Sequence, residues 1–388
     1  MSRYYRKEAS KPDLIAEHDT WISIDPVLGC PANCSYCYLA SHGLIGVRPR
    51  IEMEPAEALE RLSLYLGDRS DSTPICIGNY TDMLSGPATT SYLLKFMHLY
   101  SESNLSRPLC VVTKGVLTDA FVRELPEMDC TPLFFFSQSF ARECSPRIEL
   151  GKIASTSQTL ENIARCAASM RATPIHFWRP FLSSLNTHDQ IATRIYALKD
   201  AGVNSSVVIG LKGNHPTNFS GEQRVVGFVD NDVDEITVSH DEIFSNELWQ
   251  YAKSIALKLE LPLYRNTSCA IALSLKRAEA LGTWREPIKQ DKCLPANCPN
   301  DQRSKCELES HIKIKNDDVF AIIETHFGTE LSRSFFFDSG NILCSKEPID
   351  EFVLNQIHHL VGVAPLNGGV IRRKAWLGSF SGRNGNEE

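Results

Sequence analysis

The chain has 388 residues, 43% of them hydrophobic and 22% charged, which is usual for a globular protein of two or three domains. It contains no run of eighteen apolar residues, and Met1–Tyr5 lacks the apolar core of a signal peptide, so we expect a cytoplasmic protein without a membrane segment. Its thirteen cysteines would then be metal ligands or reduced thiols. The net charge of −7 argues against general binding of nucleic acid, although a local basic surface is compatible with it.

Residues 1–19 are polar and predict an irregular arm, after which apolar runs alternate with segments of helical spacing up to about residue 210. The predicted strands are 20–25, 74–78, 109–113, 132–138, 173–181 and 206–210. The predicted helices are 56–66, 91–100, 119–125, 157–171 and 188–201. Continuous apolar runs are typical of parallel strands covered on both faces, and their alternation with helices implies right-handed βαβ units. The pattern predicts an α/β fold, a six-stranded (β/α)6 partial TIM barrel, with its chemistry at the carboxyl ends of the strands.

The remaining pattern predicts a strand at 234–240 and a helix at 241–261. The composition changes from about residue 309, and a helix at 317–325, strands at 334–337 and 341–344, and a helix at 349–360 follow. We therefore expect four parts: an N-terminal arm (1–19), the barrel (20–262), a cysteine-rich segment (263–308) and a small α+β domain (309–388).

Three cysteines stand close together directly after the first predicted strand. Cys30, Cys34 and Cys37 have the spacing C-x3-C-x2-C, with Tyr36 just before the third. A tight loop of three thiolates can hold three irons of a [4Fe–4S] cluster and leave the fourth iron open. A structural zinc loop or plain core cysteines are the alternatives. Zinc loops usually have a second ligand pair about fifteen residues further on, whereas no cysteine follows Cys37 until Cys76.

This motif resembles the signature of the radical S-adenosylmethionine (SAM) enzymes, whose core is a (β/α)6 partial barrel. The resemblance implies that the open iron binds the amino and carboxylate groups of SAM. Reductive cleavage of SAM then gives a 5′-deoxyadenosyl radical that abstracts a hydrogen from the substrate. An electron donor such as flavodoxin or ferredoxin is implied as a partner. The expected substrate is a small molecule, a nucleotide or a short peptide, which is epimerised, rearranged or crosslinked.

Polar residues follow several predicted strands, where radical SAM enzymes bind SAM. By that resemblance Gly78 and Asn79 approach the amino group of SAM, Ser137 the ribose, and Arg179 the carboxylate. The alternative for each is an ordinary hydrogen-bonding residue at a strand end.

Four short blocks resemble the spore photoproduct lyase-like branch of these enzymes: 81–82, 112–115, 137–139 and 148–151. In the first of these blocks the lyase has a hydrogen-donating cysteine two residues before the aspartate. The aspartate of this chain is Asp82, and the residue two positions before it is Tyr80. Tyr80 and Lys114 are therefore the candidate catalytic residues, with simple packing as the alternative for Tyr80. Nucleic-acid lesion repair is the alternative function that the branch implies, and a non-catalytic iron–sulfur or zinc protein is the third.

A second cysteine group lies in the cysteine-rich segment. Cys293, Cys298 and Cys306 have the spacing C-x4-C-x7-C in what we expect to be a loop, 293–306, rich in proline and asparagine. Cys269 lies upstream in a partly apolar setting. Four thiolates would complete a second, closed [4Fe–4S] cluster, whereas three would leave one iron open for substrate. A zinc site with four thiolates and unligated thiols are the alternatives.

Overall fold

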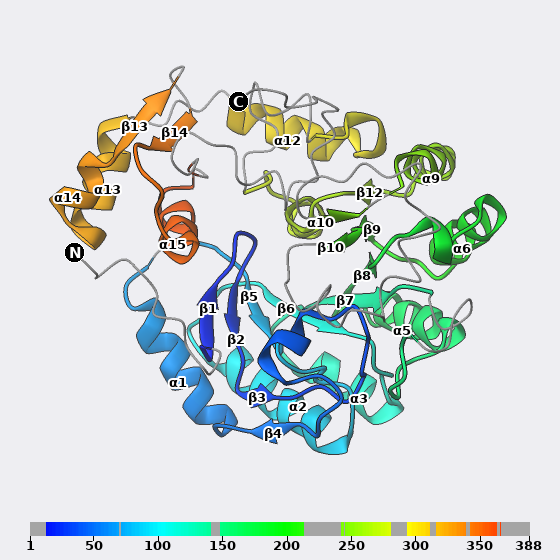
Figure 1. Cartoon of the computed structure of the whole chain (residues 1–388). Coiled ribbons are helices and arrows are strands. Elements are labelled where there is room, and N and C mark those ends of the chain that lie inside the picture. Colours follow the sequence, from blue (N-terminus) through cyan, green and yellow to red (C-terminus); the bar gives the residue numbers. More distant parts are fainter. Residues whose placement is uncertain are drawn as a thin grey trace.

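The computed structural model describes residues 13–69, 71–140, 148–212, 242–243, 245–280, 293–310, 316–338, 342–362 and 365. Its centre is an eight-stranded sheet in the order β1-β2-β5-β6-β7-β8-β9-β12 (Figure 1). The strands are β1 (Ile15–Glu17), β2 (Ile22–Ile24), β5 (Ile75–Ile77), β6 (Leu109–Thr113), β7 (Leu133–Gln138), β8 (Thr173–Trp178), β9 (Ser205–Val208) and β12 (Leu263–Tyr264). Strand β1 pairs antiparallel with β2, and all later neighbours pair parallel.

Helices connect the parallel strands and cover one face of the sheet. They are α1 (Pro55–Leu66), α2 (Pro87–Glu102), α3 (Asp119–Glu124), α5 (Thr156–Ser169), α6 (His188–Asp200) and α9 (Asn246–Lys258). On the other, concave face lies α10 (Thr267–Ser274), which packs against β9 and β12. Two separate two-stranded antiparallel sheets lie in the same part of the chain. One pairs β3 (Val27–Leu28) with β4 (Arg50–Ile51), and the other pairs β10 (Leu211–Lys212) with β11 (Glu242–Ile243).

Strand β7 shows why the predicted strands are continuous runs of apolar residues. Phe134 and Phe136 belong to the core between sheet and helices, and Leu133 and Phe135 to the core on the concave face. Successive side chains of a strand point to opposite faces, so a sheet covered on both sides needs apolar residues at every position. The α/β class with a mostly parallel sheet is therefore confirmed, and each of the six predicted parallel strands is present.

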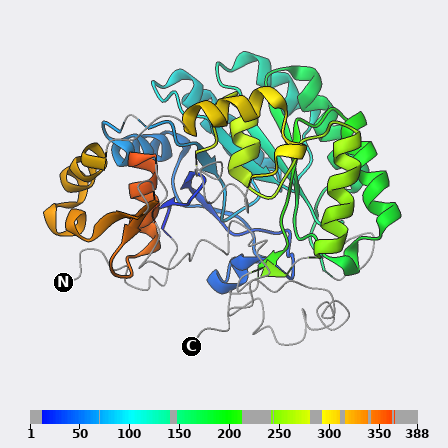
Figure 2. The same ribbon diagram turned by 90° about the horizontal axis from the view of Figure 1, so that it is seen from above.

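The remaining described elements are α12 (Asn300–Ser310) and a C-terminal unit. This unit consists of α13 (Asn316–Phe327), α14 (Thr329–Arg333), β13 (Phe335–Asp338), β14 (Ile342–Ser345) and α15 (Glu351–Val361), and it has its own apolar core. Figures 1 and 2 show it at the β1 edge of the sheet, where α15 contacts β1. No helix in the described ranges has the length and apolar character that crossing a bilayer requires.

The contact between α15 and β1 is polar and buried. The carboxylate of Glu17 accepts hydrogen bonds from Arg69 (2.6 Å) and Tyr65 (2.9 Å) and contacts His359 of α15. Asn355 of α15 donates to the Glu17 carbonyl oxygen (3.4 Å). Burial raises the pKa of Glu17, but His359 and Arg69 outweigh that effect and hold it below the ordinary value.

Several predicted elements differ in the structure. The N-terminal arm was expected to be irregular, yet Ile15–Glu17 forms β1 because β2 offers it a backbone partner. The strand predicted at 173–181 ends at Trp178, and the helix predicted at 241–261 runs from Asn246 to Lys258. The sheet continues into β12, one strand beyond the expected end of the barrel at residue 262. The strand predicted at 234–240 lies outside the described residues.

Candidate functional site

The first cysteine loop follows β2 and β3, at the carboxyl end of the parallel strands. It begins at Gly29, whose φ of +101° lies in the left-handed region that favours glycine. The amide of Gly29 donates to the Tyr80 carbonyl oxygen (3.1 Å), and the Thr81 hydroxyl donates to the Gly29 carbonyl oxygen (2.5 Å). The loop that carries Cys30, Cys34 and Cys37 is thus fixed to the segment that follows β5.

A second segment, residues 148–151, lies directly on the loop, and we call it the strap. Ser35 donates its amide to the Ile148 carbonyl oxygen (2.8 Å), and Gly151 donates to the Ala32 carbonyl oxygen (2.8 Å). A Cβ atom at Gly151 would lie 2.2 Å from the Pro31 carbonyl oxygen, a distance that real Cβ atoms essentially never show. The glycine therefore allows the two backbones to approach, and the strap and loop hold one another in place.

Glu149 of the strap joins the loop to the strand ends. Its carboxylate pairs with Lys114 (2.9 Å) and accepts a hydrogen bond from the Tyr36 hydroxyl, while Lys114 also donates to the Ser137 carbonyl oxygen (3.3 Å). Burial raises the pKa of Glu149, but Lys114 and Tyr36 outweigh burial and lower it. Burial lowers the pKa of Lys114, and Glu149 with its neighbours reverses that shift. Both groups are therefore charged at neutral pH, and both lie close enough to Cys34 to influence its titration.

Asp82 anchors Lys114 from the other side. Its carboxylate accepts hydrogen bonds from the Thr113 hydroxyl (2.6 Å), the Lys114 amide (2.6 Å) and the Leu84 amide (3.0 Å). A Cβ atom at Gly115 would lie 2.5 Å from the Leu84 carbonyl oxygen, so this turn also depends on a glycine. The residues of the four sequence blocks thus form one connected support for the cysteine loop.

The three thiols of the loop lie close to one another. They lie close enough for Cys30 and Cys37 to influence the titration of Cys34, and burial raises the pKa of Cys30 to about 12. Lys114 and Arg179 supply positive charge at Cys37. Within the described part of the chain, no three His, Cys, Asp or Glu side chains are placed to share one metal ion. Each thiolate of a [4Fe–4S] cluster binds its own iron, so ligands of a cluster need not converge on one point.

The predicted SAM-binding residues lie at the carboxyl ends of β5, β7 and β8. Gly78, with φ +87°, and Asn79 follow β5, and the Asn79 carbonyl oxygen accepts a hydrogen bond from the Tyr38 hydroxyl. The half-buried Ser137 lies near the end of β7. Arg179 follows β8, and its guanidinium lies 5.8 Å from the centre of the Phe177 ring. Arg179 is also close enough to Cys37 for its positive charge to lower the pKa of that thiol.

Tyr80 lies beside the loop in an aromatic group. Its ring centre is 6.3 Å from that of Tyr38 and 5.3 Å from that of His42. Its amide donates to Asp25 (3.0 Å), a residue that sequence reasoning missed. Asp25 is fully buried, and burial raises its pKa to about 7. Its position as the first carboxylate after β2, at the start of the cysteine segment, was the available signal.

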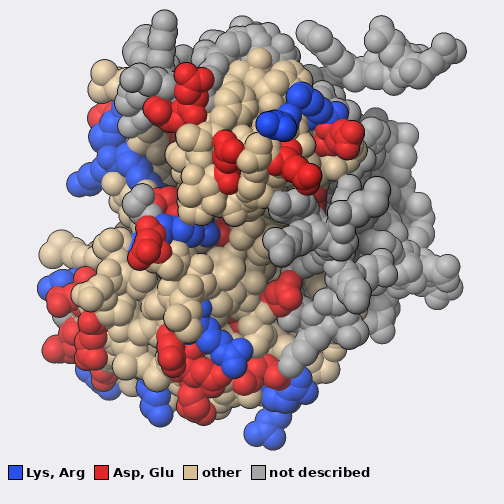
Figure 3. Space-filling model, turned by 90° about the vertical axis from the view of Figure 1, so that its left-hand side faces the viewer, with Lys and Arg blue, Asp and Glu red and all other residues tan. Residues whose placement is uncertain are grey.

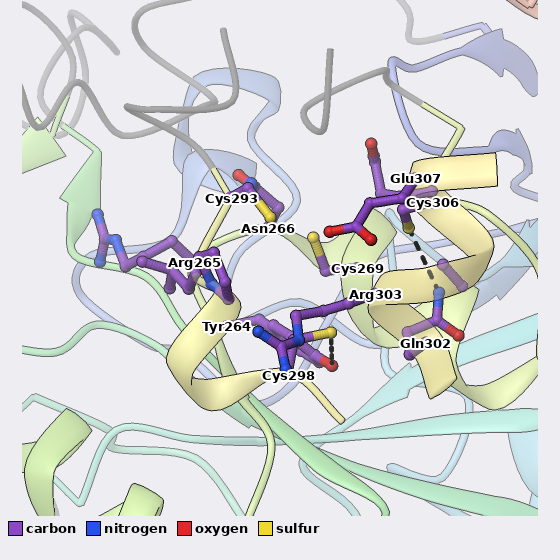
Figure 4. Close-up of a pocket in the computed structure, with 14 residues that line it drawn as sticks. Tyr264, Arg265, Asn266, Cys269, Cys293, Cys298, Gln302, Arg303, Cys306 and Glu307 are labelled. Atoms are coloured by element: carbon purple, nitrogen blue, oxygen red, sulfur yellow. Dashed lines mark hydrogen bonds between the residues drawn. The ribbon is translucent and has the colours of Figure 1, made fainter. Parts of the chain in front are cut away.

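The second cysteine group converges on one pocket (Figure 4). Cys269 lies in α10, Cys298 directly after a short 3₁₀ helix (Pro295–Asn297), and Cys306 in α12, whereas Cys293 lies outside helices and strands. The expectation that all of 293–306 is loop was wrong for Cys306. Cys269 and Cys298 also pack against the core on the concave face of the sheet.

Comparison with known proteins shows structural likeness without close sequence relatives. No protein-family model and no curated protein sequence matches the chain. Spore photoproduct lyase complexed with dinucleoside spore photoproduct is similar with a TM-score of 0.53 and 15% identity, over 66% of this chain and 79% of that chain. A lyase mutant with bound AdoMet and the same dinucleoside is similar with a TM-score of 0.51 and 14% identity, over the same shares. Over about two thirds of its length the chain therefore has the fold of spore photoproduct lyase.

Proposed function

We propose that the protein is a radical SAM enzyme in which Cys30, Cys34 and Cys37 hold a [4Fe–4S] cluster. The observation that carries this proposal is a three-cysteine loop at the carboxyl end of β2 in a sheet of this fold. When bound, the cluster and SAM would supply a 5′-deoxyadenosyl radical after one-electron reduction by a donor such as flavodoxin or ferredoxin. The substrate loses a hydrogen atom to that radical.

The residues of the chain bind and orient these groups. Gly78 and Asn79 would receive the SAM amino group, Ser137 the ribose, and Arg179 the carboxylate. Arg179 and Lys114 place positive charge beside the thiols, which favours their deprotonated, metal-binding form. The pairing of Lys114 with Glu149 holds that charge in position. Tyr80, whose ring packs beside the loop against Tyr38 and His42, would meet substrate or donate a hydrogen atom.

We further propose that Cys269, Cys293, Cys298 and Cys306 hold a second [4Fe–4S] cluster. All four line one pocket, although they come from separate elements. Four cysteines at one pocket match the four thiolates that a closed [4Fe–4S] cluster takes, and a zinc site with four thiolates is the alternative. The Cys298→Ala variant tests this: its iron should fall from about eight to about four per chain, while slow SAM cleavage persists. Unchanged iron would exclude the second cluster.

A small molecule, nucleotide or short peptide is the proposed substrate, with epimerisation, rearrangement or crosslinking as the outcome. Repair of a nucleic-acid lesion is the second candidate, because the lyase structures of like fold hold a dinucleoside photoproduct. Two observations weigh against it: Tyr80 replaces the lyase's donor cysteine, and the chain has net charge −7. On the face in Figure 3, acidic and basic side chains are mixed among the described residues.

The decisive experiment is anaerobic reconstitution followed by reduction with dithionite in the presence of SAM. A radical SAM enzyme with two clusters should contain about eight irons and eight sulfides and should release 5′-deoxyadenosine. A reconstituted protein that binds iron yet never forms 5′-deoxyadenosine would instead be a non-catalytic iron–sulfur protein. If the protein releases repaired dinucleotide from an oligonucleotide that carries the photoproduct, lesion repair replaces the small-molecule or peptide reaction as the preferred function.

A further inference from the structure

Two hydrogen bonds reach sulfur atoms of the second cysteine pocket. The Tyr264 hydroxyl donates to Cys298 Sγ (3.4 Å), and Gln302 Nε2 donates to Cys306 Sγ (3.6 Å) (Figure 4). Tyr264 ends β12 and is buried in the sheet, whereas Gln302 lies in the first turns of α12 and is also buried. Donors on two separate elements are thus aimed at two different cysteines.

Arg303 contributes a third donor. It lines the same pocket, and its buried Nε has no hydrogen-bond partner among the described residues. A buried N–H without a partner is costly, and a thiolate or sulfide in the pocket would satisfy it. The pocket is therefore better suited to a negatively charged, sulfur-rich group than to neutral thiols.

We propose, on the basis of the second cluster proposed above, that this centre is a closed one-electron cluster whose reduced state Tyr264, Gln302 and Arg303 stabilise. Four cysteines at one pocket provide one thiolate for each iron, which leaves no open iron for substrate or SAM. The sequence left open a cluster with three cysteine ligands and one open iron; the proposal is instead a cluster in which all four irons have a cysteine ligand.

Reduction adds one negative charge to the cluster. Hydrogen bonds to the thiolates and a nearby guanidinium stabilise that added charge more than they stabilise the oxidised state, so they raise the reduction potential. Glu279 and Glu307 also line the pocket, and their carboxylates act in the opposite direction. Removing one donor therefore shifts the balance toward the carboxylates and lowers the potential.

The test is a redox titration of the anaerobic holoprotein, followed by electron paramagnetic resonance with dithionite as reductant. Added SAM should alter the signal of the cluster with the open iron and leave the second signal unchanged. In Tyr264→Phe, Gln302→Leu and Arg303→Gln, we expect the SAM-insensitive signal to titrate at lower potential. A tenfold loss of reduced cluster at a fixed potential corresponds to about 59 mV for a one-electron couple. Tyr196→Phe makes the same chemical change on the exposed side of α6 and should shift neither signal.

The outcomes separate this inference from the proposed function. Four irons per wild-type chain, with SAM cleavage intact, would remove the second cluster and this inference but leave the radical SAM assignment standing. If the protein holds eight irons but the variants have unchanged reduction potentials, Tyr264, Gln302 and Arg303 do not stabilise the reduced cluster. If SAM alters both signals, the second cluster has an open iron and is not fully ligated by cysteine. Because Tyr264 is buried, its variant is first checked for iron content and circular dichroism; Gln302→Leu and Arg303→Gln carry the test if it fails to fold.

Discussion

Substitution of Gly151 by alanine tests whether the strap holds the cysteine loop. The added Cβ would lie 2.2–2.3 Å from backbone atoms of Pro31 and Ala32, which cannot rotate away as a side chain could. The strap must therefore move outward. Overpacking of this kind costs about 1–3 kcal/mol, and loss of the Gly151–Ala32 hydrogen bond adds about 0.5–1.5 kcal/mol. We expect the variant to be destabilised by about 2–4 kcal/mol.

The assay combines thermal unfolding of the metal-free protein with iron analysis after anaerobic reconstitution. Gly151→Ala should unfold several degrees lower and should lose the iron of the SAM cluster faster than wild type during gel filtration. Gly86→Ala is the matched control, because a Cβ there meets no atom within 4 Å and its φ of −176° is open to any residue. If Gly151→Ala matches wild type in both stability and iron retention, the strap does not support the loop.

Three further outcomes are expected. Cys34→Ala should abolish 5′-deoxyadenosine formation yet leave the circular dichroism of the fold intact, and wild-type product formation would refute the cluster assignment. The lowered pKa of Glu17 means that its contribution to stability is full above about pH 4.5 and is lost as the pH falls through its folded-state value. The stability difference between wild type and Glu17→Gln should therefore shrink below pH 4.5, and parallel pH curves would contradict this. Binding to duplex DNA at physiological salt should be weak in a gel-shift assay; submicromolar, steeply salt-dependent binding would favour the repair function.

The sequence predicted the parallel strands well because each needs apolar residues on both faces. It predicted β1 poorly, since Ile15–Glu17 contains a charged residue and is only three residues long. Tertiary contacts stabilise this strand: β2 supplies its backbone hydrogen bonds, and Arg69 and His359 contact the Glu17 carboxylate. His359 lies 342 residues further along the chain, so no local pattern could reveal this contact.

The sequence also predicted the second cysteine group only in part. Its cysteines were identifiable from number and spacing, but the helix that carries Cys306 was not. Helix α12 (Asn300–Ser310) is polar and has no apolar stripe that a helical period would reveal. The hydrogen bonds to sulfur were equally hidden, because Tyr264 and Cys298 are 34 residues apart and meet only when β12 joins the sheet.

The first cysteine loop is supported by a chain of hydrogen bonds that joins three segments of the molecule. Asp82, Lys114 and Glu149 form a continuous chain of hydrogen bonds from the strand ends to the strap, and Tyr36 extends that chain to the loop. Asp82 and Glu149 are buried and Lys114 and Tyr36 partly so, and replacing one partner leaves another unpaired at a cost of about 1–3 kcal/mol. Tyr80 joins this support through its backbone, which contacts Asp25 and Gly29, and its ring packs against Tyr38 and His42. Under the function proposed above, a change of side chain at position 80 would alter what meets the substrate and leave the two backbone hydrogen bonds in place.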